Sequence, residues 1–350
     1  MELDEQQLNN FVGKMLGDLG GAMSLSTARI GFKLGLFKSL AEQGPIDAIC
    51  LAEKSGLAPR YVREWAHAQT ANGYITHNNG KFHMTPEQQM VFVVEDSPVY
   101  MQGAFDVAAA MIEGQDKVAE GFRTGDGVAW GDSAGCLFCA VGAFFRPTYV
   151  NSLVQQWIPA LDGMEGRLKA GAKVADIGCG VGFSTLLMAK AFPESEFVGF
   201  DFHEGSIEQA RKHAADHGVD DRVRFEIAEA KEIGEDGFDL VTVFDCLHDM
   251  GDPRGCASHV KSILKDDGAW MICEPIAGDR LEENLSPVNR LYFNASTMIC
   301  APTSLDQEVG EALGAQAGEA RLRDVLCDGG FSSVRRVTEG SFNMILEARP

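Results

Sequence analysis

The stretch Val174-Ala-Asp-Ile-Gly-Cys-Gly-Val-Gly-Phe-Ser-Thr185 decides the fold of this chain. Its first four residues read as a buried parallel strand, its glycines as a tight turn, and residues 183–192 as a helix. Such a turn brings backbone N–H groups and a helix N-terminus close to a ligand. Phe183 stands where the dinucleotide fingerprint has its third glycine, and no lysine follows, as a P-loop requires. The stretch therefore predicts a ligand-binding turn that is neither a dinucleotide-binding fingerprint nor a P-loop.

Acidic residues follow the predicted strands of the C-terminal half. From Lys173 onward, strands alternate with helices, which is typical of a parallel sheet covered on both faces. Ligands of such sheets bind beyond the carboxyl ends of the strands. Asp201 lies there, 19 positions after Gly182, which is the spacing expected of a carboxylate that accepts from ribose hydroxyls. The strands that we expect are 174–177, 196–200, 223–227, 238–244, 269–273, 333–337 and 342–348.

The order of these features resembles the class I S-adenosylmethionine (SAM) methyltransferases, whose first motif has the form Asp-x-Gly-x-Gly-x-Gly. The resemblance covers residues 173–350 and implies an α/β, Rossmann-like domain with a seven-stranded sheet and an antiparallel final strand. It implies SAM as cofactor, with the methionine ammonium on Asp176, the ribose on Asp201 and the adenine between Phe202 and Glu229. The residues expected to contact SAM are Asp176, Gly178, Gly180, Gly182, Asp201, Phe202, Glu229, Phe244 and Asp245.

The N-terminal third reads as a winged helix. Helices near 46–55 and 60–71 are followed by a hairpin around Asn78-Asn-Gly80, a strong turn signal. A DNA-binding winged helix needs a basic recognition face, and the net charge of −21 argues against one. The module is therefore expected to serve in dimerisation and as a lid, as in the small-molecule O-methyltransferases that this chain resembles. A SAM-responsive transcription regulator stays as the alternative.

An apolar stripe precedes this module, and the chain is expected to have three parts. The stripe would mediate a homodimer or pack on its own chain; it consists of Leu8, Phe11, Val12, Met15, Leu16 and Leu19. The expected division is a winged-helix domain at 1–98, a helical linker at 99–165 that contributes to the active site, and a SAM-binding domain at 166–350.

The segment Leu247-His-Asp249 after the fourth strand resembles the plant and bacterial O-methyltransferases that carry a His-Asp pair there. The pattern is similar to a bacterial group of that superfamily through residues 60–65, 245–253 and 295–304. The resemblance implies that His248 is the general base of the catalytic set His248, Asp249 and Glu274, with Glu274 fixing its tautomer. A histidine that only packs or caps at this position is the alternative.

The acceptor is expected to be a small molecule with either a hydroxyl or a thiol group. A hydroxyl must lose its proton to a base, whereas a thiolate forms near neutral pH and needs a weak base or none. The motif after the fourth strand is not that of many amino or nucleobase methyltransferases. The residues expected to contact the acceptor are Trp130, Phe145, Arg146, Tyr292 and Asn294.

The composition of the chain indicates the cellular compartment that suits it. The sequence has 350 residues, and the sequence pI is about 4.7. The acidic N-terminus does not resemble a signal peptide, and no membrane segment is expected. Nine cysteines, an odd number scattered through apolar segments, suit a reducing cytoplasm. The pair Cys136-Leu-Phe-Cys139 has no second Cys/His pair at ligand spacing, so helical packing and no bound metal are expected.

Overall fold

The computed structural model describes residues 3–133 and 136–350. It divides into two compact units, Met1–Ala109 and Ala110–Pro350. The boundary falls within helix α6 (Gln102–Thr124), which begins in the first unit and ends in the second.

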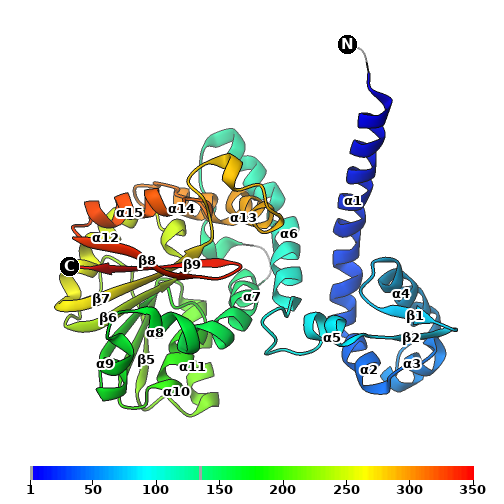
Figure 1. Cartoon of the computed structure of the whole chain (residues 1–350), viewed down its shortest axis with the longest axis horizontal. Coiled ribbons are helices and arrows are strands. Elements are labelled where there is room, and N and C mark those ends of the chain that lie inside the picture. Colours follow the sequence, from blue (N-terminus) through cyan, green and yellow to red (C-terminus); the bar gives the residue numbers. More distant parts are fainter. Residues whose placement is uncertain (1–2, 134–135) are drawn as a thin grey trace. The chain divides into compact units, whose positions relative to one another are not determined.

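The first unit contains the predicted winged helix (Figure 1). Asn79 and Gly80, at the hairpin turn, both have positive φ angles of 49° and 76°. Two consecutive positive φ angles match the right-handed twist of a two-residue hairpin, which explains the Asn-Gly sequence. The elements are α1 (Glu5–Lys33), α2 (Leu36–Gln43), α3 (Ala48–Ser55), α4 (Pro59–Ala71), β1 (Thr76–Asn78), β2 (Lys81–His83) and α5 (Pro86–Phe92).

Helix α1 joins the winged helix only through its C-terminal part. Its Gly31 lies so close to Phe37 and Trp65 that an added Cβ would come within 2.7 Å of both rings. The Trp65 indole N–H donates to the carbonyl of Thr27 at 2.9 Å, which fixes this contact. The residues of the predicted apolar stripe, from Leu8 to Leu19, are all exposed in the single chain.

The second unit is built on one seven-stranded sheet with the order β5-β4-β3-β6-β7-β9-β8. Strands β3 to β7 are parallel to one another, and β9 is antiparallel to both of its neighbours. The predicted α/β fold with an antiparallel final strand is therefore confirmed. The strands are β3 (Lys173–Ile177), β4 (Glu196–Asp201), β5 (Val223–Ile227), β6 (Phe238–Phe244), β7 (Leu264–Pro275), β8 (Ser333–Glu339) and β9 (Asn343–Arg349).

Helices cover both faces of this sheet, with α12 and α15 on one side and α9, α10 and α11 on the other (Figure 1). Because side chains alternate along a strand, Val174 of β3 packs in one core and Ala175 in the other. The helical elements are η1 (Trp130–Asp132), α7 (Leu137–Ser152), η2 (Leu153–Trp157), α8 (Ile158–Ala160), α9 (Met164–Ala170), α10 (Phe183–Ala191), α11 (Glu204–His217), η3 (Leu247–Asp249), α12 (Pro253–Ile263), η4 (Leu281–Glu283), α13 (Pro287–Ala295), η5 (Ser296–Cys300), α14 (Ala301–Asp306) and α15 (Glu319–Asp328).

The stretch Leu137–Ala160, made of α7, η2 and α8, is long and apolar enough by length and composition to cross a bilayer. A core helix of a soluble domain meets the same criteria. Here Tyr149, Leu153, Trp157 and Ile158 are buried in the core on one face of the sheet. These contacts attach part of the stretch to the sheet, and 22% of its apolar window is buried.

Candidate cofactor and acceptor site

A cavity of about 490 Å³ opens beyond the carboxyl ends of β3, β4 and β6. This is where a parallel sheet of this type binds its ligands. Most of the predicted site residues line it: Trp130, Phe145, Gly178, Gly180, Asp201, Phe202, Glu229, Phe244, Asp245 and Asp249.

The three glycines of the turn after β3 serve different purposes. All three have positive φ angles, 67° at Gly178, 53° at Gly180 and 82° at Gly182. Gly180 lines the cavity, and a Cβ there would meet open space, so its backbone is free to approach a ligand. A Cβ on Gly182 would lie 2.7 Å from the ring of Phe225 and 3.0 Å from Ala210. Gly182 thus allows close packing of α10 and does not line the cavity, contrary to the expectation that it contacts SAM.

The predicted role of Asp176 also needs correction. Its carboxylate is fully buried and accepts hydrogen bonds from the hydroxyls of Ser184 at 2.7 Å, Thr185 at 2.6 Å and Thr242 at 2.9 Å. Burial raises the pKa of Asp176 to about 6, although the hydrogen bonds from these three hydroxyls oppose the rise. Asp176 is therefore not a lining residue available to the methionine ammonium. It ties the end of β3 to the first turn of α10 and to the neighbouring strand β6.

Asp201 occupies the position predicted for a ribose contact. Each carboxylate oxygen receives one backbone N–H: Oδ2 from Gly180 at 2.9 Å and Oδ1 from His203 at 2.9 Å. Burial raises the pKa of Asp201, and the hydrogen bonds from His203 and Gly180 counter part of that rise. The two N–H donors hold the carboxylate at the cavity wall, with lone pairs left on both oxygens for a ligand.

Asp245 is held at the cavity wall by two residues that sequence reasoning missed. The Tyr149 hydroxyl donates to Oδ2 at 3.1 Å, and the Asn343 amide donates to Oδ1 at 2.6 Å. Its backbone has a positive φ of 51°, an uncommon conformation for a residue other than glycine. Burial, and then the charge of Glu274, raise the pKa of Asp245 to about 8. A cationic ligand group beside this carboxylate would favour its ionised form.

His248 is buried between two carboxylates. Its Nδ1 contacts Glu274 Oε2, and its Nε2 lies 3.0 Å from Asp249 Oδ1. Burial by itself would lower the pKa of the imidazole, but the charges of Asp249 and Glu274 outweigh it and raise the pKa well above 6.5. The predicted pairing of His248 with Glu274 is therefore present in the structure.

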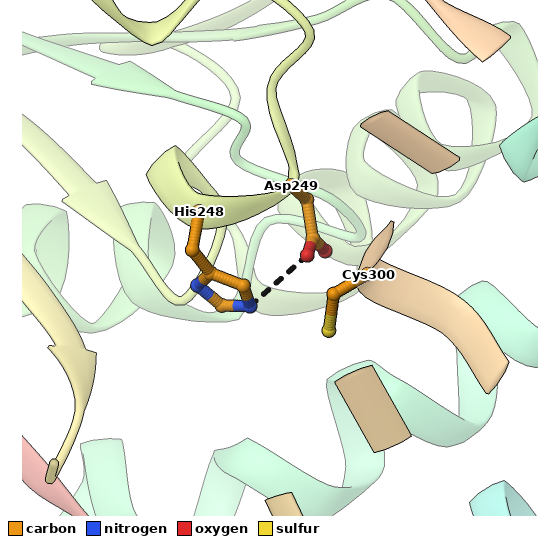
Figure 2. Close-up of side chains that lie close together, drawn as sticks. All are labelled: His248, Asp249 and Cys300. Atoms are coloured by element: carbon orange, nitrogen blue, oxygen red, sulfur yellow. Dashed lines mark ion pairs between the residues drawn. The ribbon is translucent and has the colours of Figure 1, made fainter. Parts of the chain in front are cut away.

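Cys300 joins this pair from another part of the chain. The Nε2 of His248, a carboxylate oxygen of Asp249 and the Sγ of Cys300 all lie within 4.8 Å of one another (Figure 2). Cys300 had no assigned role in the sequence, since only the fold brings η5 to η3. The cluster joins three potential metal ligands of different types.

Three residues expected to contact the acceptor do not line the cavity. The Tyr292 hydroxyl donates to the carbonyl of Phe342 at 2.9 Å, and the Asn294 amide donates to the carbonyl of Arg290. Arg146 lies over the ring of Phe183, 6.0 Å from its centre. Their contacts in the structure are therefore with the protein itself.

Phe138, which lies between two bonded cysteines of the chain, forms part of one wall of the cavity. Cys136 and Cys139 form a disulfide, so the expectation of simple helical packing for this pair was wrong. Phe138 lines the cavity and packs edge-on against His203, with ring centres 4.9 Å apart. The sequence signal was the CxxC spacing itself, which we set aside because no second Cys/His pair lies at ligand spacing.

Two domain families match this chain. Residues 21–93 match the Rv2258c-like winged helix-turn-helix domain, and residues 168–320 match the methyltransferase domain. The second range covers the glycine turn, the strand-end acids and the His248 cluster.

Known proteins resemble this chain in sequence or in fold. A ubiquinone biosynthesis O-methyltransferase of Bordetella avium is 32% identical over 36% of this chain, a match that spans 51% of the relative. A mouse (Mus musculus molossinus) acetylserotonin O-methyltransferase is 25% identical over 94% of this chain and 86% of its own length. Human N-acetylserotonin methyltransferase, solved with SAM, has a TM-score of 0.72 at 17% identity, covering 100% of this chain and 99% of its own. The chain therefore carries a methyltransferase domain at residues 168–320, preceded by a winged helix-turn-helix domain at residues 21–93.

Proposed function

We propose that this protein transfers a methyl group from SAM to the hydroxyl or thiol group of a small molecule. One observation carries the proposal: a single cavity is lined both by Asp201, at the cofactor end, and by Asp249, next to the buried His248–Glu274 pair. The cofactor and the proton-handling residues would thus share one site. The relatives named as O-methyltransferases support oxygen as the acceptor atom.

The placement of the acids suggests how SAM would be held. Asp201 would accept from the ribose hydroxyls, and Glu229 and Phe202 would flank the adenine, since all three line the cavity. Asp245 replaces Asp176 as the carboxylate for the methionine ammonium, because Asp245 lines the cavity and Asp176 does not.

The protein needs to do little covalent chemistry in this reaction. SAM, when bound, supplies a methyl group already activated by a sulfonium. The protein must hold the acceptor in line and exclude water. For a hydroxyl acceptor, Glu274 would orient the imidazole through Nδ1, and Nε2 of His248, which lies 3.0 Å from Asp249, would take the proton when the imidazole is in its neutral form. Trp130 and Phe145 would give the acceptor an apolar wall.

We also propose that the exposed stripe of α1 binds a second copy of this chain. Residues such as Phe11 and Leu16, 59% and 65% exposed, form one side of a helix that its own unit leaves uncovered. A DNA-reading role is disfavoured, because Arg60 in α4 already pairs with Glu64 on the same exposed face. A DNA shift assay at low salt checks this, since saturable, steeply salt-dependent binding would restore the regulator alternative.

The test of function is SAM turnover by the purified protein against a panel of acceptors. The panel contains phenols, hydroxy acids, sulfide and short thiols, and S-adenosylhomocysteine is the measured product. We expect turnover with at least one class. Tight SAM binding without turnover on any acceptor would contradict a small hydroxyl or thiol substrate and favour a larger acceptor or a regulator.

A further inference from the structure

Three side chains that commonly bind transition metals meet beside the cavity. His248 and Asp249 come from the short helix η3, and Cys300 comes from η5, the π-helical segment between α13 and α14. Figure 2 shows the imidazole, the carboxylate and the thiol on converging sides of one small space. Their nearest ligand atoms are all within 4.8 Å of one another.

The contact between His248 and Asp249 is close but is not a well-directed hydrogen bond. Nε2 and Oδ1 are 3.0 Å apart, yet among the residues that the structure describes this buried Oδ1 has no hydrogen-bond partner. Glu274 Oε2 takes the Nδ1 side of the ring, and Nε2 faces the Asp249 carboxylate, with the thiol of Cys300 beside them. A divalent cation bound between these atoms would take the place of the Nε2 proton.

The donor set and its spacing suit a zinc-like ion. Zinc binds nitrogen and oxygen at about 2.0–2.2 Å and sulfur at about 2.3 Å in tetrahedral geometry, which places ligand atoms roughly 3.3–3.6 Å apart. The Nε2–Oδ1 separation of 3.0 Å is close to this range, and all three ligand atoms lie within 4.8 Å of one another. Three protein ligands with an open fourth position are typical of catalytic rather than structural zinc.

The surroundings of the cluster support the same conclusion. A histidine that binds a metal through one ring nitrogen commonly donates from the other to a carboxylate. Glu274 occupies that place beside Nδ1 of His248. Cys300 is the last residue of a π-helical turn, a distortion that is frequent at functional sites. Asp249 lines the SAM cavity, so the open position would be reached from there.

We propose that His248 Nε2, Asp249 Oδ1 and Cys300 Sγ bind one divalent transition-metal ion, and that its fourth position takes the sulfur of a thiol acceptor. The metal site stands on its own geometry, whereas the acceptor rests on the proposed methyl transfer. The bound thiol loses its proton to solvent, and the thiolate sulfur forms a bond to the methyl carbon. The methyl–sulfonium bond breaks, its electron pair stays on the cofactor sulfur, and a neutral thioether leaves. In this form His248 is a ligand and not the base.

The test begins with metal binding by the full-length protein. After treatment with a chelator and gel filtration, we expect Zn²⁺ or Co²⁺ to bind at about one equivalent per chain. The Co²⁺ form should show sulfur-to-metal charge-transfer absorption together with the visible bands of tetrahedral cobalt. Cys300→Ser should lose the charge-transfer band, and Asp249→Asn should weaken Zn²⁺ binding about 100-fold, at least as much as outer-shell changes do. Cys327→Ser removes an exposed free thiol elsewhere and should change neither.

Different outcomes separate the metal site from the proposed function. Circular dichroism and SAM binding by calorimetry show whether each variant is folded, and the metal signals are read only from folded variants. Less than about one-tenth of an equivalent of metal, or an unchanged charge-transfer band in Cys300→Ser, would overturn the site even if methyl transfer proceeds. Metal binding at one equivalent without turnover on any thiol would retain the site and overturn the thiol acceptor.

Discussion

Replacing Asp201 should weaken SAM binding by an amount that the structure allows us to work out. The carboxylate already accepts one N–H on each oxygen, from Gly180 and His203. Its remaining lone pairs would accept both ribose hydroxyls, and hydrogen bonds to a charged group contribute about 1.5–3 kcal/mol each. Losing two at the lower end removes about 3 kcal/mol. This corresponds to a rise in the Kd for SAM of roughly 150-fold in Asp201→Ala, since each 1.4 kcal/mol is a factor of ten.

The assay is calorimetric titration with SAM, and an analogue without one ribose hydroxyl serves as the matched ligand. Removing the hydroxyl should weaken binding to the wild type but hardly change binding to Asp201→Ala, because the partner of that hydroxyl is already gone. Thermal unfolding without ligand accounts separately for the two N–H groups that lose their acceptor. A Kd within threefold of the wild type, in a folded variant, would refute the ribose assignment.

Three further outcomes follow from the structure. His248→Ala should lower kcat for a hydroxyl acceptor about 100-fold or more without changing the Kd for SAM; full activity would remove His248 from the chemistry. Leu16→Glu should turn a dimer into a monomer in sedimentation equilibrium, whereas Asn10→Glu, off the apolar stripe, should not. A dimer in both variants would place the interface elsewhere. The pKa of Asp176 is about 6 in the folded chain against 3.8 in the reference state, so its stabilising effect is complete below pH 3.8 and is lost as the pH rises through 6. Urea titrations of the wild type at different pH values should show this loss as a fall of up to about 3 kcal/mol in the free energy of unfolding. The fall should disappear in Asp176→Asn. If the variant kept the pH profile of the wild type, the raised pKa could not belong to Asp176.

The fold could be predicted from the sequence because its signals are local. The glycine turn, the apolar strands and the acids that end them lie within short stretches, and sheet topology then places the strand ends on one edge. Asp201 was therefore found by counting from Gly182. The Asn-Gly hairpin turn was equally local.

The errors arose where a contact depends on distant parts of the chain. Asp176 sits at a strand end like Asp201, and only its three hydroxyl partners show that it is buried away from the cavity. Tyr149 and Asn343 reach Asp245 across 96 and 98 positions, which no spacing rule connects. Cys300 meets His248 only because a π-helical turn carries it there.

The contact between Asn343 and Asp245 has a consequence for the order of events during synthesis. Strand β9 lies between β7 and β8, so the sheet cannot close until residues beyond 343 have left the ribosome. Until then, Asp245 can have the Tyr149 hydroxyl as a partner but lacks the Asn343 amide, one of the two contacts that hold its uncommon backbone conformation. The winged helix has emerged long before that point. A nascent chain should therefore acquire its first unit early and its full capacity to bind SAM only after strand β9 has emerged.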